Sequence, residues 1–128
     1  MLRSPGVSLL VDAVAHMRRR GATFADVRHV VDEREQLAVR DGRVERHFRA
    51  SSSGFGVRVL VRGPNGGAWG FAARAGHRDD AAALAEAAEA ALAVARAAAA
   101  INRAPIELAE EEPQRGHCFQ KSAHDRPL

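Results

Sequence analysis

The six histidines are the side chains best suited to acid–base or metal chemistry near neutral pH. None stands in an HExxH or related arrangement, which would place two metal ligands on one face of a helix. His117, Cys118 and His124 are close in sequence, but a structural zinc site needs four ligands and this segment has no pattern of a scaffold. We therefore predict no catalytic residues, no metal ligands and no cofactor held by this chain itself.

A base and a nucleophile lie close together where His47 precedes Ser51–Ser53. A working pair also needs an orienting acid and an oxyanion hole, and the sequence indicates neither. Three residues remain candidates for contact with a substrate or partner: Arg58 in the middle of a predicted strand, and His47 and Arg49 on the outward side of a predicted hairpin. The alternative for Arg58 is a pair with a carboxylate on the neighbouring strand. The alternative for His47 is a simple exposed strand position.

Length and composition indicate one globular domain. The chain has 128 residues, of which 46% are hydrophobic and 27% charged, with a formal net charge of +3. The basic residues are scattered rather than clustered, so no surface for nucleic acid is predicted. The amino-terminal apolar run contains Asp12 and precedes Arg18–Arg20, the wrong charge order for a signal peptide. With one cysteine and no apolar run long enough for a bilayer, we expect a cytoplasmic protein without a membrane partner.

Two helices are predicted to flank a block of strands. Residues 5–20 carry apolar side chains at helical spacing and end before Gly21, a residue typical of the position after a helix. Residues 79–100 are rich in alanine, the strongest helix former, and begin with Asp79 or Asp80 as a capping residue.

The block between the helices alternates apolar and polar residues, which is typical of strands. A first strand is predicted over residues 25–34, followed by a hairpin whose Asp41-Gly42 sequence favours a type I′ turn. Ser51–Ser53 are interpreted as a break before a strand that begins at Phe55. After the Gly- and Pro-rich turn at residues 63–67, a last strand follows, in which Trp69 and Phe71 are expected to be core residues.

This order of elements predicts an α+β fold. We expect a largely antiparallel sheet of four or five strands with one buried face and with two helices packed on one face. Residues 1–103 would form this domain, and residues 104–128 an extended acidic linker and an irregular tail. The tail holds the only lysine, Lys121, and the only cysteine, Cys118. This compositional shift suggests an interrupted reading frame of a longer protein, which sequencing beyond the stop codon would test.

An RNA-binding module is a second interpretation of the same strands. Ser53–Leu60 partly matches the RNA-recognition strand motif, in which aromatic side chains stack on bases. The Gly-Phe-Gly core agrees with that motif, whereas the leading basic residue and the two later aromatic residues are missing. The predicted order of strands and helices also differs from the order this module requires.

Read together, the strand segments resemble the amino-terminal domain of the TldD/PmbA family, also called modulators of DNA gyrase. The matching segments lie within residues 10–112, and the Ala-rich helix follows them as in the family. They are Ala25-Asp26-Val27-Arg28, Asp41-Gly42-Arg43-Val44-Glu45, Gly54-Phe55-Gly56-Val57-Arg58-Val59-Leu60 and Gly70-Phe71-Ala72.

The resemblance implies a role in proteolysis. A TldD-like subunit is a zinc-dependent peptidase that works with a TldE/PmbA-like partner, and its zinc site resembles an HExxxH helix motif in the carboxy-terminal half. This sequence contains no such motif. We therefore expect an amino-terminal domain that positions substrate or partner and is inactive alone, with zinc belonging to the full-length family member. A free edge of the sheet could add a peptide substrate or the partner subunit. The alternative is a free-standing interaction or regulatory domain.

Overall fold

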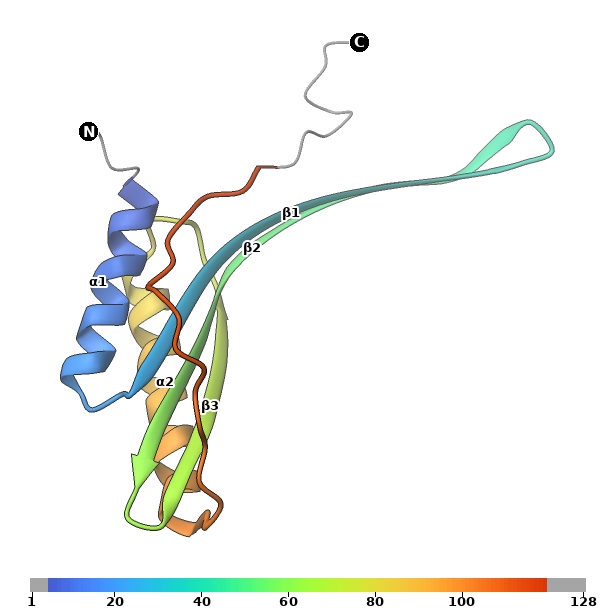
Figure 1. Cartoon of the computed structure of the whole chain (residues 1–128). Coiled ribbons are helices and arrows are strands. Elements are labelled where there is room, and N and C mark those ends of the chain that lie inside the picture. The colour runs from blue at the N-terminus through green and yellow to red at the C-terminus, as the bar shows by residue number, and fades with distance from the viewer. Residues whose placement is uncertain (1–4, 120–128) are drawn as a thin grey trace.

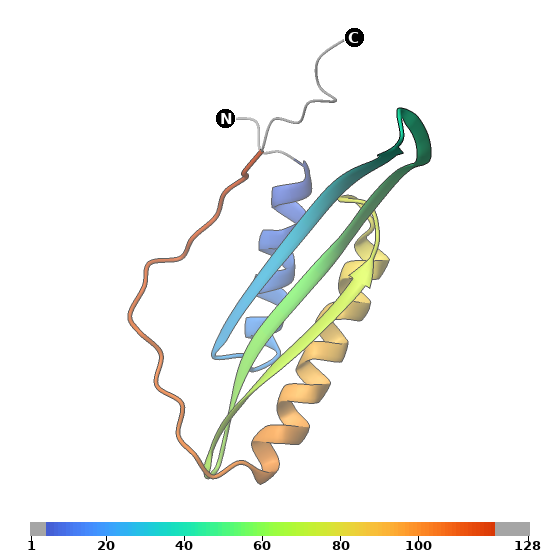
Figure 2. The ribbon, with the colours of Figure 1, turned by 90° about the vertical axis from the view of Figure 1, so that its right-hand side faces the viewer.

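The computed structural model describes residues 5–119, which form two helices and one antiparallel sheet (Figure 1). In chain order the elements are α1 (Pro5–Arg19), β1 (Phe24–Arg40), β2 (Arg43–Gly63), β3 (Gly66–Ala75) and α2 (Ala81–Ile101). The strand order is β1-β2-β3. Both helices lie behind the same face of the sheet, which leaves the other face uncovered by helices (Figure 2). The α+β class is confirmed.

The expected number of strands was wrong, because the described part of the chain has three long strands rather than four or five. Ser51–Ser53 do not break β2: they pair with Val31, Asp32 and Glu33 of β1 in continuous antiparallel register. Apolar alternation disappears in this segment because neither face is buried there, and the main chain can still pair. The turn itself is as predicted, since Asp41 and Gly42 both have positive φ, at 50° and 73°.

The core lies between the helices and the inner face of the sheet. Phe55, Val57 and Val59 alternate along β2 and are almost fully buried against the alanine-rich face of α2. Most of the inner face of β3 carries small residues, Gly70 among them, and Arg74 near the end of the strand is the exception. A Cβ on Gly70 would collide with the main chain of α2 at Ala91. Small residues on both elements therefore let the helix lie directly on the strand.

The carboxyl end of α1 and the start of α2 have the capping residues that the sequence predicts. The N–H of Ala22 donates to the carbonyl of Met17 and the N–H of Gly21 donates to that of Arg18, with Gly21 at a φ of 101°. These are the two bonds of a Schellman motif, which satisfies the last carbonyls of α1. At the start of α2 the N–H of Ala83 donates to Oδ1 of Asp80 over 3.0 Å, so Asp80 is the N-cap.

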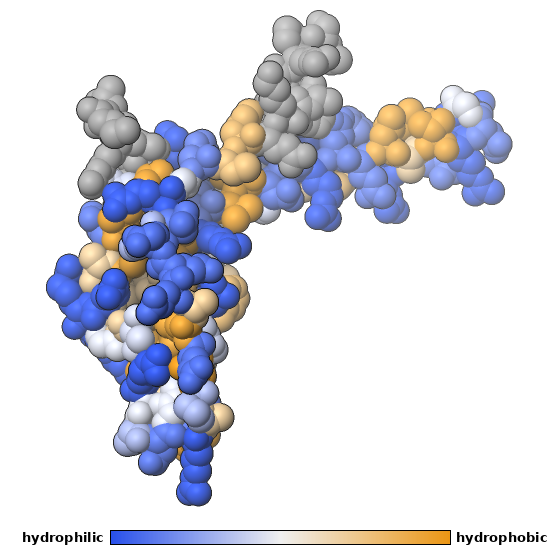
Figure 3. Space-filling view, in the orientation of Figure 1, coloured by the Kyte–Doolittle hydropathy of each residue, from blue (hydrophilic) through white to orange (hydrophobic). Residues whose placement is uncertain are grey.

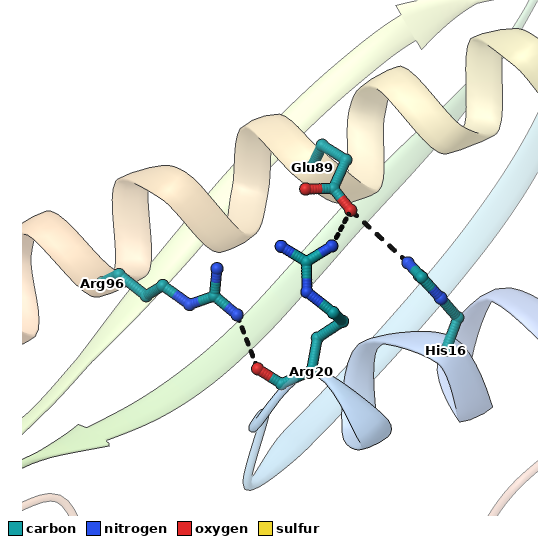
Figure 4. A network of polar contacts seen from close by, with 4 residues as sticks. All are labelled: His16, Arg20, Glu89 and Arg96. Atoms are coloured by element: carbon teal, nitrogen blue, oxygen red, sulfur yellow. Dashed lines mark hydrogen bonds and ion pairs between the residues drawn. The ribbon is translucent and has the colours of Figure 1, made fainter.

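Polar contacts join the two helices beside the sheet (Figure 4). Oε1 of Glu89 lies 2.8 Å from Nη1 of Arg20 and 3.4 Å from Nε2 of His16. The guanidinium of Arg96 donates to the carbonyl of Arg20 over 2.5 Å. About half of the His16 and Glu89 side-chain surface is exposed, so these contacts set the position of α1 on α2 more than they stabilise the fold.

Beyond the third strand, β1 and β2 continue alone as a two-stranded ribbon. The pairing of β2 with β3 ends at Gly54 and Ala75, while its pairing with β1 runs on to the turn at Asp41. The ribbon, residues 31–53, is called the arm here and curves away from the helices (Figure 1). The expectation of one buried face is wrong for the arm, because it lies outside the helix-covered body. Apolar surface is open along the arm, where Figure 3 shows it in orange. The exposed apolar side chains of the arm include Val31, Leu37, Val39, Val44 and Phe48.

Trp69 and Phe71 are not core residues, contrary to the expectation. They lie on the outer face of β3, and 38% of Trp69 and 66% of Phe71 is exposed. Alternation correctly placed them on one side of the strand, but α2 leaves room only for the small side chains on the opposite side. Volume at the helix contact, rather than hydrophobicity, decided which face of β3 became the inner one.

After α2 the described chain, residues 102–119, contains neither a helix nor a strand. The start of this segment is attached to the beginning of β3, because Nδ2 of Asn102 donates to the carbonyl of Gly67 over 2.5 Å. Ile106 and Leu108 are half-buried, while Glu110–Glu112 are exposed. Lys121 and His124, on which part of the expectation for the tail depended, lie outside the described residues. No helix within residues 5–119 has the length and apolar character needed to span a bilayer.

Candidate functional site

Arg58 lies in the centre of β2 and points away from the helices. Its register neighbours are Asp26 on β1 and Phe71 on β3, which place all three side chains on the outer face. Nη2 of Arg58 donates to Oδ2 of Asp26 over 2.5 Å. The cross-strand carboxylate partner, which the sequence left as an alternative, is therefore present.

Two aromatic rings complete the surroundings of Arg58. Its guanidinium carbon is 5.2 Å from the ring centre of Trp69 and 5.9 Å from that of Phe24, distances at which a cation is attracted to a ring face. The two rings meet edge to face, with centroids 5.7 Å apart. Leu60, between them in the register, is fully buried. The outer face thus carries an ordered aromatic cluster around a charged group that is half exposed.

His47 and Arg49 lie far along the arm, on the strand face that continues the inner face of the body. Nε2 of His47 is 2.7 Å from Oε1 of Glu35, and Arg49 is the register partner of the same Glu35. The structure therefore places these two predicted residues on one face of the arm, beside Glu35. Because 55% of the His47 side chain is exposed, the group can reach a partner that docks on the arm.

The structure does not bring Arg58 together with the other two candidates. Eleven residues of extended strand separate Arg58 from His47, a distance on the order of 35 Å. The odd difference in position also places their side chains on opposite faces of β2. The predicted residues thus belong to two surfaces: the aromatic cluster on the outer face of the body, and the Glu35–His47 pair on the arm.

A third surface, at the root of the arm, was missed by sequence reasoning. It is a shallow apolar depression on the outer face, where β3 ends beside β2. Gly54 and Gly56 leave its floor without side chains, and a Cβ on Gly54 would collide with the carbonyl of Arg74. The signal in the sequence was the pair of glycines flanking Phe55, which had been interpreted as part of a possible RNA motif and of the family resemblance, not as a surface. Phe55 itself is 2% exposed and its ring is tilted against that of His29, with centroids 4.6 Å apart, so it offers no surface to a base.

A catalytic zinc ion needs three protein ligands close together. Among residues 5–119, no three side chains of histidine, cysteine, aspartate or glutamate lie close enough to hold one metal ion. His29 and Ser53 both contact the carbonyl of Gly76, at 3.0 Å each, and thereby hold the loop before α2. The donor set present here does not fit a catalytic zinc ion, and no step of metal-assisted hydrolysis is derived from it.

A known protein family matches the part of the chain that contains the sheet. The family model described as PmbA/TldA metallopeptidase domain 1 matches residues 25–95, more than half of the chain. The match begins at the second residue of β1, includes the arm and β3, and ends within α2. No curated protein matches the chain. The order of strand segments that resembles the TldD/PmbA amino-terminal domain is thereby confirmed, and the chain belongs to the PmbA/TldA metallopeptidase family through its first domain.

Proposed function

We propose that this chain is a positioning domain of a TldD/PmbA-type zinc metallopeptidase, which holds peptide substrate or a partner subunit while the metal chemistry is done elsewhere. The observation that carries the proposal is the arm, a ribbon of two strands whose outer edges pair with no other strand of residues 5–119. An extended peptide can add to such an edge through main-chain hydrogen bonds, which do not depend on its side chains. A protease that acts on unfolded peptides needs that kind of binding.

Two further features support a role in binding rather than in catalysis. The sequence contains no HExxxH motif, and residues 5–119 offer no cluster of metal ligands. The zinc ion and the water it would activate therefore require residues beyond those described here, in a TldD-like subunit or another segment. The outer face of the body, with Phe71 and Trp69 exposed beside Arg58, gives such a subunit an apolar and charged surface to contact.

A free-standing interaction or regulatory domain is the second candidate function. The same arm favours it, because the arm needs no catalytic neighbour to present its edges. The two candidates differ in what they bind: a positioning domain binds extended peptides in general, whereas a regulatory domain binds a folded TldD- or TldE/PmbA-like subunit selectively. RNA binding lacks its expected stacking residue, because Phe55 is in the core.

The proposal is tested by shortening the arm. Residues 33–38 pair with residues 46–51 in continuous register. Both blocks can therefore be removed together, and each remaining side chain stays on the same face of the ribbon. The Asp41-Gly42 turn is retained. Binding of fluorescein-labelled, unstructured peptides to the chain and to the shortened variant is measured by anisotropy. We expect the shortened variant to bind at least about tenfold more weakly, because most of both free edges is gone.

A matched control separates edge binding from side-chain binding. The double variant His47→Ala, Arg49→Ala removes the two candidate side chains but leaves the edges in place, so general peptide binding should fall by less than about threefold. Circular dichroism establishes that both variants keep the body folded. Equal peptide affinity of the intact and shortened chains would refute the positioning role. Selective capture of a purified TldD- or TldE/PmbA-like subunit without peptide binding would instead establish the regulatory alternative.

A further inference from the structure

The outer edge of β1 in the arm has a charge pattern that is complementary to itself. From the root of the arm toward its tip the strand reads Val31-Asp32-Glu33-Arg34-Glu35-Gln36-Leu37-Ala38-Val39-Arg40. Proteins protect a free edge against pairing with charges that repel a second strand. Here the sign of the charge changes along the edge: three acidic residues with Arg34 among them lie toward the root, and Arg40 lies at the tip.

We propose that the β1 edge of the arm pairs antiparallel with the same edge of a second copy of this chain, about a two-fold axis at Gln36. In this register Asp32 of each copy lies opposite Arg40 of the other, and Arg34 lies opposite Ala38. The two arms would join into a four-stranded ribbon in the order β2-β1-β1-β2. Such an interface is isologous, because each copy contributes the same segment.

Alternative symmetric registers bring like charges together. An axis at Glu33, Arg34 or Glu35 places that charged residue directly opposite its own copy. An axis at Leu37 places Arg34 opposite Arg40. Between Glu33 and Leu37, only the axis at Gln36 opposes no like charges, and it also opposes two pairs of unlike charges. Directly opposed like charges destabilise strand pairing and unlike charges stabilise it, so the charge pattern selects this register.

The groups that would form these pairs are available. The side chain of Asp32 is exposed and has no ion-pair or hydrogen-bond partner within residues 5–119. Arg40 makes one long contact of 3.9 Å with Glu45, and 76% of its side chain is exposed. Leu37 and Val39, on the other face of the strand, are 60% and 57% exposed and would lie opposite Glu35 and Glu33 of the second arm. Backbone pairing and the charges of Asp32 and Arg40 thus act in the same direction.

The arm itself has surface that a second copy can cover. Every residue of β1 from Val31 to Arg40 is exposed except Ala38, which is half-buried. A stable interface of ordinary size buries about 1,600 Å² in total, or about 800 Å² per partner. This inference is independent of peptide binding, since self-association would hold whether or not the β2 edge accepts a peptide.

Sedimentation and light scattering of the purified chain at about 100 µM test the proposal first. We expect a mass of twice 13.7 kDa. Asp32→Arg and Arg40→Asp should each raise the dissociation constant about tenfold or more, because each variant opposes like charges twice across the two-fold axis. The double variant restores unlike pairs in the reversed sense and should return to within about threefold of the original affinity. Arg34→Asp is the matched control, with the same charge change opposite an uncharged residue.

A cysteine placed at the axis gives a second measurement. In a Cys118→Ser background, Gln36→Cys places two thiols directly opposite each other, with Cα atoms about 5 Å apart, which suits a disulfide. Leu37→Cys in the same background offsets the two thiols along the strands and should cross-link poorly. A monomer at all concentrations, or stronger cross-linking through Phe48→Cys on β2 than through Gln36→Cys, would overturn the proposal. A monomeric chain that uses this edge only to bind a TldD-like subunit would overturn it as well.

Discussion

Arg58 and Asp26 form an ion pair across β1 and β2, with Nη2 of the arginine 2.5 Å from Oδ2 of the aspartate. The pair lies on the outer face of the sheet beside Trp69, whose ring centre is 5.2 Å from the guanidinium carbon. A residue singled out as a possible ligand for a substrate or partner therefore already has a carboxylate and an aromatic ring as partners. Its contribution to stability can be separated from any contribution to binding.

Arg58→Ala should lower the free energy of unfolding by about 1 kcal/mol, because an exposed ion pair and a cation–π contact each contribute up to about that amount. Arg58→Lys should recover only part of it, since lysine keeps the charge but not the flat group that stacks on Trp69. Urea denaturation of these variants and of Asp26→Ala, arranged as a double-mutant cycle, measures the coupling. An unchanged unfolding midpoint in Arg58→Ala would show that this arginine has no structural role.

Two phenylalanines on opposite faces of the sheet should differ sharply. Phe55→Ala should cost about 3–5 kcal/mol, because the side chain is 2% exposed and its loss leaves a cavity under α2. Phe71→Ala should cost less than about 1 kcal/mol, because 66% of the residue is already exposed. Thermal unfolding followed by circular dichroism compares them. A similar loss of unfolding free energy in both variants would contradict the exposure of Phe71 and would mean that the outer face of the sheet is covered in solution.

Two glycines provide a matched test of the contact between β3 and α2. Gly70→Ala should destabilise the fold by about 3 kcal/mol or more, because the added Cβ meets the main chain of the helix at Ala91, which cannot move alone. Gly56→Ala adds the same atom on the outer face, where the nearest neighbour is the ring of Phe71 at 3.7 Å. That variant should change stability by less than about 1 kcal/mol in urea denaturation. A tolerant Gly70→Ala variant would contradict the close approach of the helix.

The contacts that join α1 to α2 should depend on salt. Glu89→Gln keeps the shape of the side chain but removes the charge that faces Arg20 and His16. It should lower the free energy of unfolding by about 0.5–1 kcal/mol at low ionic strength, and the difference should shrink in about 1 M salt. Glu86→Gln is the control, since this carboxylate is 70% exposed and 3.7 Å from Arg74. An equal effect of the two substitutions would exclude a specific role for Glu89.

Some predictions from the sequence were confirmed because local chemistry was enough to decide them. Asp41-Gly42 adopts positive φ at both positions, as a type I′ turn requires, and Asp80 caps α2. The Schellman motif at Gly21 likewise depends only on neighbouring residues. The family was identifiable for a related reason, since it depends on the order of short strand segments along the chain.

The long strands were not predictable from apolar alternation. Ser51–Ser53 carry no apolar pattern, yet they pair with Val31, Asp32 and Glu33 in an unbroken register. Alternation reports which face of a strand is buried, and the arm has no buried face. Main-chain hydrogen bonds can hold such a ribbon without leaving a signal in the pattern of apolar residues.

The sequence by itself determined the helices, the turns, the antiparallel connections and the family, because each of these depends on residues that are near neighbours in the chain. Only the tertiary structure decided that Trp69 and Phe71 lie outside, that Arg58 and His47 belong to separate surfaces, and that β1 and β2 extend beyond the body. The physical reason is that burial depends on what packs against a face. Gly70 and the alanines of α2 bring the helix onto one side of β3, while β3 ends at Ala75 and leaves the arm without a neighbour.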